Sequence, residues 1–479
     1  MQKRVIILFV FITFASFLLA ETVSLRNDPE INAAFVYIES LVEGLRKDQN
    51  IPGLSAAVVI DQDMVWGKGY GFANLEKKIE ATPDSIYRIA SITKLFTATM
   101  LMQLRDKGKL QLDDPLVKYI PQFLIKNPFE GARPITLRQI ASHSSGLPRE
   151  APLDYMKNLN FPSTEEILNS LKEAELIFKP LSEFKYSNLG MALLGHALEK
   201  AAGQPYQEYI REKILVPLEM SKTAFEIEPR IERCLATGYT QSTDKKSFKP
   251  APLYDMKGMS PCGQLYSTVE DMSRFMAFQF HESGGHQDKV LSRFSIDEMH
   301  NVEIMDEEWK TGVGIGWAVI RLGEETAIGH SGGIHGYQTN ILLVPRLKVG
   351  TAVFANSSNA SPMKISQEIL GILIPAVKRV KLRIEKREEP DALPKEWIKY
   401  TGVYEWKELG QAIEIKIKGN RLVVISPNDP GLIIYLSPEK ENVFRMKEGP
   451  FDGEFLRFQL DKEGKVINAY LGNYCFERK

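Results

Sequence analysis

The sequence predicts an α/β protein in which helices flank an antiparallel sheet, with an all-helical insertion lobe and a small antiparallel β-barrel at the carboxy terminus. Three observations lead to this fold class. β-rich segments stand at both ends of the first 380 residues, helical segments broken by proline and glycine fill the middle, and short alternating segments follow a charged stretch near the end. A sheet assembled from both ends of one unit, with the middle inserted as helices, gives a fold with two lobes.

The composition is that of a globular protein and excludes several classes of function. Hydrophobic residues make up 44% and charged residues 25% of the 479 residues, enough for more than one core. The 60 basic and 61 acidic side chains leave a net charge of −1, so we expect no nucleic-acid partner. The three cysteines lie far apart without a CxxC pair, which excludes a zinc knuckle and a dense disulfide framework.

Residues 1–20 have the pattern of a secretory signal peptide. Lys3 and Arg4 precede an apolar run that is short for a spanning helix, which needs about 20 residues. Leu18 stands where a small residue is preferred before a cut after Ala20, so an uncleaved membrane anchor remains the alternative. In either case we expect the bulk of the chain to be extracytoplasmic: secreted, periplasmic or anchored facing outward.

We expect residues 28–380 to form one unit. Apolar residues at helical spacing predict a helix over 31–45, and two β-rich runs around a short turn predict a hairpin over 54–70. Helical segments punctuated by proline and glycine extend from about 95 to 320. Three strands and a closing helix are then predicted, over 325–330, 337–344, 349–354 and 363–380.

A separate β domain is predicted over residues 393–479. The charged stretch 378–389 leads into Pro390, so we expect a solvated linker over 381–392. Residues 412–418 alternate strictly, and Gly419-Asn420 can form a hairpin turn. Further short strands at 432–436, 455–460 and 466–471 complete a small antiparallel sheet or barrel.

Ser91 and Lys94 stand three residues apart at the start of the predicted helix 95–107. The Lys94 amine can therefore reach the Ser91 hydroxyl, and helix N-terminal N–H groups can stabilise negative charge that develops there. A desolvated lysine can serve as the base that a serine nucleophile needs. The Ser-x-x-Lys spacing occurs five times, but only Ser91 opens a long apolar-periodic helix after strands. A helix-capping serine is the alternative interpretation.

Two further motifs can contribute to such a site. In Tyr186-Ser187-Asn188, the phenol can relay a proton and the amide can orient a substrate carbonyl, although a loop tyrosine beside an asparagine helix cap is the alternative. The segment Gly329-His330-Ser331-Gly332-Gly333 stands at the end of a predicted strand, where the Gly333 N–H can hold an oxyanion. Its alternative is a glycine-rich turn with a satisfied histidine.

In this order the three motifs resemble the serine β-lactamase and penicillin-binding protein superfamily, specifically its class C β-lactamase-like branch of DD-peptidases and esterases. The resemblance covers about residues 30–380 and includes 135–148 and 265–272, which are similar to characteristic stretches of that branch. It implies a β-lactamase/transpeptidase-like fold and a serine hydrolase that acts through an acyl-enzyme, without metal or organic cofactor.

The resemblance also implies roles for individual residues. Ser91 would be acylated, Lys94 would be its base or the partner of its base, and Tyr186 would relay the proton to the leaving group. Asn188 would hold the substrate amide. The oxyanion would be bound by the N–H groups of Ser91 and Gly333, and the far strand of the pocket would be lined by His330, Ser331 and Gly332.

One departure from the family bears on the substrate. His330-Ser331-Gly332 stands where β-lactamases of this branch usually carry Lys-Thr-Gly, and an imidazole with a pKa near 6.5 holds a carboxylate less firmly than a lysine. We therefore expect D-amino-acid peptides or esters as substrates. β-Lactam hydrolysis, or a penicillin-binding sensor without turnover, is the alternative.

Other parts of the chain have less specific interpretations. The carboxy-terminal unit resembles the lipocalin-like domains appended to some of these hydrolases. Four roles are open to it: gating of the cleft, oligomerisation, binding of an apolar ligand, and simple packing against the hydrolase unit. We interpret His143 as structural, with its ring bonded to backbone. For His335 a surface-loop role is favoured over a place in the cleft.

Overall fold

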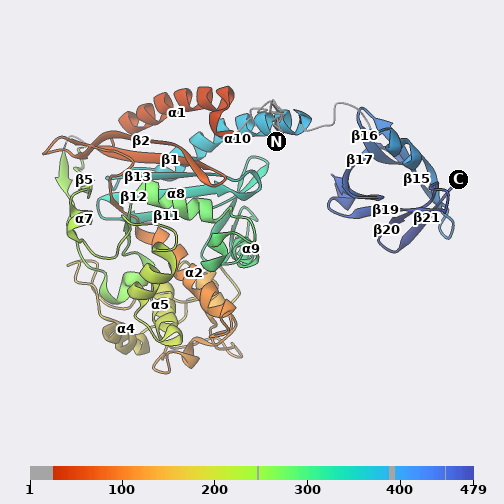
Figure 1. The fold of residues 1–479 in the computed structure, drawn as a ribbon. Coiled ribbons are helices and arrows are strands. Elements are labelled where there is room, and N and C mark those ends of the chain that lie inside the picture. Colours follow the sequence, from red (N-terminus) through yellow and green to blue (C-terminus); the bar gives the residue numbers. More distant parts are fainter. Residues whose placement is uncertain (1–24, 245–246, 388–393, 448) are drawn as a thin grey trace, which may run out of the picture. The chain divides into compact units, whose positions relative to one another are not determined.

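The computed structural model describes residues 25–244, 247–387, 394–447 and 449–479 (Figure 1). The chain divides into two compact units between Val380 and Lys381, each of which is described here by itself. The predicted leader, residues 1–20, lies outside the described residues. Within the described ranges, none of the helices is both long and apolar enough to cross a membrane.

A nine-stranded antiparallel sheet, in the order β3-β2-β1-β13-β12-β11-β10-β9-β8, forms the centre of the first unit. Strand β1 (Gly53–Ile60) pairs with β13 (Val349–Ala355), with Leu54 opposite Ala355, so the two ends of the unit meet in mid-sheet as the sequence predicts. All eight residues of β1 are buried, which suits its small and β-branched side chains. The other strands are β2 (Asp63–Asn74), β3 (Ile79–Glu80), β8 (Ile304–Met305), β9 (Thr311–Val313), β10 (Ala318–Leu322), β11 (Glu325–Ile334) and β12 (Tyr337–Val344).

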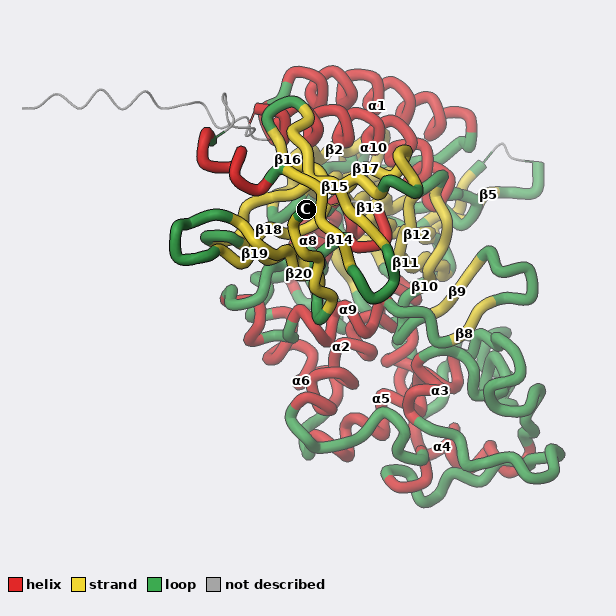
Figure 2. Tube along the Cα trace, turned by 90° about the vertical axis from the view of Figure 1, so that its right-hand side faces the viewer, coloured by secondary structure: helices red, strands yellow, loops and turns green. Residues whose placement is uncertain are grey.

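Helices cover both faces of this sheet. Helices α1 (Pro29–Asp48) and α10 (Pro362–Arg387) lie together on one side of it, and α2 and α5 lie on the other (Figures 1 and 2). Asp28 caps α1 by accepting a bond from the Glu30 N–H at 2.9 Å, and Phe35 of α1 stacks on Trp66 of β2 with ring centroids 6.0 Å apart. The predicted amphipathic helix 31–45 is thereby confirmed.

Helix α2 (Thr93–Asp106) is the central element of the helical lobe. Every residue from Thr93 to Leu104 is buried, and Phe96 stacks on Phe275 of α8 at 4.4 Å. The remaining helices of the unit are α3 (Leu137–Ala141), α4 (Thr164–Ser170), α5 (Asn188–Ala202), α6 (Tyr206–Ile210), α7 (Pro229–Glu232), α8 (Val269–Phe278) and α9 (Arg293–His300). Two short ladders join loops, β4 (Tyr87–Arg88) with β7 (Tyr266–Ser267) and β5 (Tyr239–Gln241) with β6 (Phe248–Pro250).

The second unit contains a closed barrel of eight antiparallel strands in chain order, which confirms the predicted carboxy-terminal barrel. Such an up-and-down closure is the architecture of lipocalins. Its interior is packed with side chains, among them Tyr404, Phe444 and Phe458. The strands are β14 (Gly402–Trp406), β15 (Gln411–Lys418), β16 (Arg421–Ser426), β17 (Asp429–Lys440), β18 (Val443–Lys447), β19 (Phe455–Leu460), β20 (Val466–Leu471) and β21 (Tyr474–Arg478).

The predicted linker 381–392 is wrong over its first seven residues, because helix α10 continues to Arg387. Lysine, arginine, glutamate and leucine are all good helix formers, so a charged stretch without a breaker can continue a helix as well as end one. Residues 388–392 of the predicted linker lie outside the described residues.

Candidate active site

Ser91 lies in a 3₁₀ turn, Ala90–Ile92, between β4 and the first residue of α2. Ala90 has a φ of +47°, a left-handed conformation that a residue with a side chain adopts only at a cost. Ser91 caps neither the turn nor α2, so the interpretation as a helix cap is wrong. Instead it lines a cavity, and its Oγ accepts a hydrogen bond from Lys94 Nζ at 3.0 Å.

Lys94 is fully buried, and its amine contacts three oxygens. Besides Ser91 Oγ, Nζ donates to Asn188 Oδ1 at 2.8 Å and to the carbonyl of Cys262 at 2.7 Å. An ammonium has three N–H bonds, so each has a partner and the buried charge is not left unsatisfied. The structure thus brings together Ser91, Lys94 and Asn188, as the sequence predicts, and adds a backbone carbonyl.

The aromatic ring of Tyr186 lies beside the amine. Lys94 Nζ is 4.9 Å from the centre of this ring, and the His330 ring is 6.2 Å from it. Ser187, and not Asn188, caps helix α5: its Oγ accepts a bond from the Gly190 N–H at 2.8 Å. The interpretation of Asn188 as a helix cap is therefore wrong, and the amide is free to point at Lys94.

The ring of His143 packs against the ring of Tyr186. The two ring centroids lie 4.4 Å apart, and His143 Nδ1 accepts the Ser187 N–H at 3.2 Å, as predicted for a structural histidine. Burial lowers the pKa of His143 well below its usual range, and the positive charge of Lys94 lowers this pKa further. A neutral His143 whose Nδ1 accepts carries its proton on Nε2.

The glycine-rich segment lies inside β11, so the predicted turn at the end of a strand is wrong. Pairing of β11 with β10 ends at Gly329, whereas pairing with β12 continues to Ile334, which leaves one edge of the strand without a partner strand. The Ser91 turn packs on the face of β11 and β12 here: a Cβ on Gly332 would lie 2.1 Å from the carbonyl oxygen of Ile89, which also accepts a bond from Thr339 Oγ1 at 3.0 Å. Gly333 and Ser91 line the same cavity, where their backbones can share an oxyanion.

His330, on β11, is partly buried. Its protonation state decides whether this part of the strand carries a positive charge. Burial, together with the charge of Lys94, lowers the pKa of His330 to about 4. Its Nδ1 bonds the Ser331 carbonyl at 2.6 Å, which leaves Nε2 as an acceptor in the neutral ring. Ser331 is exposed and accepts a bond from Asn340 Nδ2 at 3.0 Å. The histidine therefore supplies no positive charge at neutral pH.

The cavity around Ser91 has a volume of about 280 Å³ and a largely apolar wall. Tyr254 stacks on Phe161 with ring centres 5.1 Å apart, and its hydroxyl bonds His335 Nδ1 at 2.9 Å. His335 is exposed in the turn between β11 and β12, as the surface-loop interpretation predicts, and it also lines the cavity. The wall is completed by Met156, Met256, Met259, Ile334, Gln338 and Ser358.

Glu150 also lines the cavity, and the sequence analysis did not identify it. Asn188 Nδ2 donates to its Oε1 at 2.6 Å, and the Tyr155 hydroxyl donates to its Oε2 at 2.7 Å. A glutamate beside an arginine in a polar loop has the pattern of a solvated surface residue. Only its place two residues after the family-like stretch 135–148 could have drawn attention to it.

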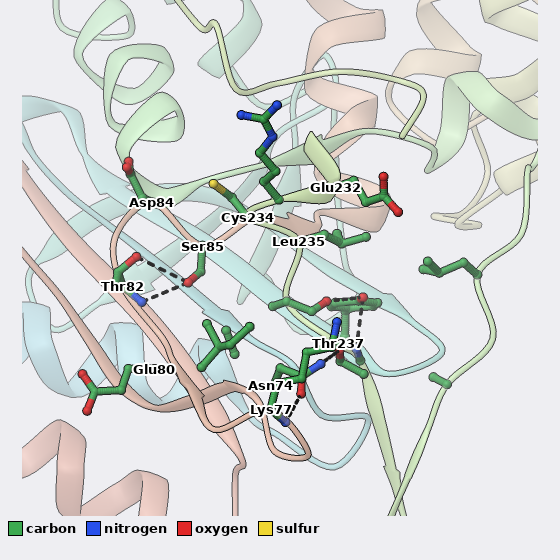
Figure 3. A pocket seen from close by; sticks show the side chains of 18 residues that line it. Asn74, Lys77, Glu80, Thr82, Asp84, Ser85, Glu232, Cys234, Leu235 and Thr237 are labelled. Atoms are coloured by element: carbon green, nitrogen blue, oxygen red, sulfur yellow. Dashed lines mark hydrogen bonds between the residues drawn. The ribbon is translucent and has the colours of Figure 1, made fainter. Parts of the chain in front are cut away.

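A larger cavity, of about 590 Å³, lies elsewhere in the first unit (Figure 3). Two groups of its polar residues bond each other: Asn74 Nδ2 donates to Thr237 Oγ1 at 2.7 Å, and Ser85 Oγ accepts from the Thr82 N–H at 2.9 Å. Groups satisfied in this way do not converge on a ligand. Within the described part of the chain, no group of three or more His, Cys, Asp or Glu residues is arranged to hold a metal ion.

Comparison with known proteins agrees with this geometry. The family model for beta-lactamase matches residues 38–371. The chain belongs to the beta-lactamase family. A curated relative, "Beta-lactamase-like protein 2" of Dictyostelium discoideum, is 31% identical over 78% of this chain and 69% of its own length. The match confirms the predicted resemblance to the β-lactamase and penicillin-binding protein superfamily, which is a superfamily of serine hydrolases.

Solved structures of the same beta-lactamase fold match one or both units. An octameric penicillin-binding protein homologue from Pyrococcus abyssi is 28% identical with a TM-score of 0.64, covering 92% of this chain and 99% of its own. A beta-lactamase/D-alanine carboxypeptidase from Yersinia pestis is 26% identical with a TM-score of 0.60, covering 72% and 99%. A class C beta-lactamase, 20% identical with a TM-score of 0.62 over 72% and 98%, shares the fold.

The contact between Gly332 and Ile89 predicts that Gly332→Ala displaces either β11 or the Ser91 turn. We expect a loss of stability of about 1–3 kcal/mol, as for other overpacked sites, and a fall of at least roughly tenfold in the rate of Ser91 acylation. Thermal unfolding and covalent labelling measure the two effects. Gly371→Ala, in the interior of helix α10 where the added Cβ meets nothing within 4 Å, is the control and should not lower the melting temperature. A Gly332→Ala variant that behaves like this control would contradict the contact.

The lowered pKa of His330 predicts a pH dependence of stability. An unfolded histidine takes up a proton near pH 6.5, whereas the folded ring takes it up only near pH 4. The unfolded state therefore binds more protons between these values, and the free energy of unfolding falls as the pH drops from about 6.5 to about 4. His330→Asn should show a smaller drop in melting temperature from pH 7 to pH 5 than the wild type. Equal drops in both proteins would show that His330 is not desolvated.

Proposed function

We propose that the protein is a serine hydrolase that forms an acyl-enzyme at Ser91 with D-amino-acid peptides or with esters. The observation that carries the proposal is the buried Lys94 amine, 3.0 Å from the hydroxyl of a serine that lines a cavity. The family and the titled activity of the Yersinia pestis protein, a D-alanine carboxypeptidase as well as a beta-lactamase, support this class of substrate.

The contacts of Lys94 indicate how the serine is activated. When the amine is neutral, its two N–H bonds can stay on Asn188 Oδ1 and the Cys262 carbonyl, so its lone pair points at the Ser91 hydroxyl. Ser91 Oγ then attacks the substrate carbonyl carbon while its proton passes to Nζ. The N–H groups of Ser91 and Gly333 bind the resulting oxyanion.

The acyl-enzyme then forms and breaks down without any further cofactor. The bond to the leaving group breaks as the proton returns to it from Nζ, with Tyr186 as the relay that lies against the amine. A water molecule attacks the ester carbonyl, and the same groups act in reverse to release the acid and restore Ser91.

The neutral His330 favours peptides and esters over β-lactams. With a pKa of about 4, His330, whose ring lies 6.2 Å from that of Tyr186, supplies no positive charge that would hold the carboxylate of a penicillin or cephalosporin. Hydrolysis of β-lactams is the second candidate, favoured by the family that the chain belongs to. A penicillin-binding sensor would differ from both by one stoichiometric burst without turnover.

The proposal predicts that Ser91→Ala abolishes covalent labelling by a fluorophosphonate or a fluorescent penicillin. Lys94→Met, which keeps the nucleophile and removes the amine, should slow acylation by roughly 10²–10⁴-fold, the range for loss of a general base. Gel fluorescence and mass spectrometry of the labelled peptide measure both results. Ser358→Ala removes another serine of the same cavity and should label normally. Labelling of Ser91→Ala at the wild-type rate would end the proposal.

We also propose that the protein acts outside the cytoplasm and self-associates. Residues 1–20 support the location, and the octameric Pyrococcus abyssi homologue, which aligns with 92% of this chain, supports the assembly. Size-exclusion chromatography with light scattering should give a mass several times that of the 54.2 kDa chain. A single species at the mass of one chain would contradict self-association.

A further inference from the structure

Glu150 gives the cavity a negative charge close to the nucleophile. Among the described residues that line the cavity it is the single carboxylate, and the others are apolar or neutral apart from the imidazole of His335. The side chain is about one-third exposed (32%), so it reaches the cavity without being fully solvated. An anionic group of a substrate placed at this end of the cavity would be repelled.

The carboxylate is connected to Ser91 by side chains alone. Lys94 Nζ contacts both Ser91 Oγ and Asn188 Oδ1, and Asn188 Nδ2 donates to Glu150 Oε1 at 2.6 Å. The family resemblance also implies that Asn188 holds the amide of the substrate. A substituent one bond from the carbonyl of that amide, on the Asn188 side, would therefore face Glu150.

The Glu150 carboxylate can accept further hydrogen bonds. Its Oε1 accepts from Asn188 and its Oε2 from Tyr155, which leaves a lone pair on each oxygen. Arg149 Nε stands 3.7 Å from Oε1, beyond hydrogen-bond distance, on a side chain that is 64% exposed. Such an exposed pair is screened by water and neutralises the carboxylate only weakly.

We propose that Glu150 selects substrates that carry a protonated amine next to the scissile carbonyl. This inference rests on the proposed acyl-enzyme function and narrows its substrates to amides, peptides or esters of amino acids with a free amino group. The ammonium donates to Glu150, a charge-assisted bond, and the side chain of the substrate packs on apolar wall residues such as Phe161 and Met156. An N-acylated substrate covers the carboxylate without supplying a donor to its remaining lone pairs, which costs affinity.

The test compares substrates that differ only in the amine. Phenylalanine p-nitroanilide and its N-acetyl derivative, each as the D and the L isomer, are assayed for kcat/KM. Their amides are assayed in parallel for protection of Ser91 against fluorophosphonate labelling. In the wild type we expect the free amine to be preferred at least roughly tenfold in both assays. The preference should decline as the pH rises through about 8, where the amine loses its proton.

Glu150→Gln removes the negative charge and keeps groups that can form the same hydrogen bonds. The amide oxygen can accept from Asn188, and the amide nitrogen can donate to the Tyr155 oxygen, so the network survives without its charge. We expect this variant to lose the preference, mainly because its kcat/KM for the free-amine substrate falls. Tyr155→Phe is the matched control: it removes one bond to Glu150, keeps the charge, and should keep the preference.

Three outcomes would overturn the inference. The wild type could have an equal or higher kcat/KM for the N-acetyl substrate, or the preference for the free amine could persist in Glu150→Gln. The third outcome is that the free-amine and N-acetyl amides protect Ser91 from labelling equally, or that neither protects it. A purely positioning role for Glu150 would lower the rates with both substrates alike and leave their ratio unchanged. Failure of the wild type to be labelled at Ser91 is a different result, because it rejects the acyl-enzyme function itself.

Discussion

The three hydrogen bonds of the buried Lys94 amine join segments that are far apart in the chain: the Ser91 turn, the start of helix α5 and the carbonyl of Cys262. An amine taken out of water is tolerated only if its N–H bonds find oxygens, so the fold is constrained to bring those oxygens there. Ser91, Asn188 and the Cys262 carbonyl are consequently held in one geometry around the single side chain of Lys94. The rest of the site is arranged around that constraint.

The sheet provides the second half of the arrangement. Because β1 and β13 from opposite ends of the unit pair in mid-sheet, and β12 and β11 follow β13 in the same sheet, β11 lies beside the Ser91 turn, which packs on the sheet at Gly332 and Thr339. A residue without a side chain at Gly332 allows the two backbones to touch. In the proposed reaction the oxyanion donors would therefore come from two main chains in contact, a rigid arrangement that would need little reorganisation.

The charges around the cavity are distributed unequally. The amine of Lys94 helps to keep both His143 and His330 neutral, so its own charge is not repeated elsewhere in the site. On the other side of Asn188, the carboxylate of Glu150 has the opposite sign. This polarity, positive at the nucleophile and negative where the acyl group would lie, distinguishes the site from one built to hold an anionic substrate.

The sequence alone determined the fold class, the order of the motifs and the identity of Ser91, Lys94, Tyr186, Asn188 and His330 as candidates. These are local features: helical and alternating periodicity, and short motifs at the starts of helices and along a strand, are readable because neighbouring residues share one element. Tertiary structure decided the rest. The carbonyl of Cys262 carries no side-chain signature, Glu150 is indistinguishable from a surface acid until Asn188 lies against it, and a glycine-rich segment reads equally as turn or strand until Ile89 is placed beside Gly332. Contacts between segments far apart in sequence depend on the packing of the whole chain, and no pattern within one segment encodes them.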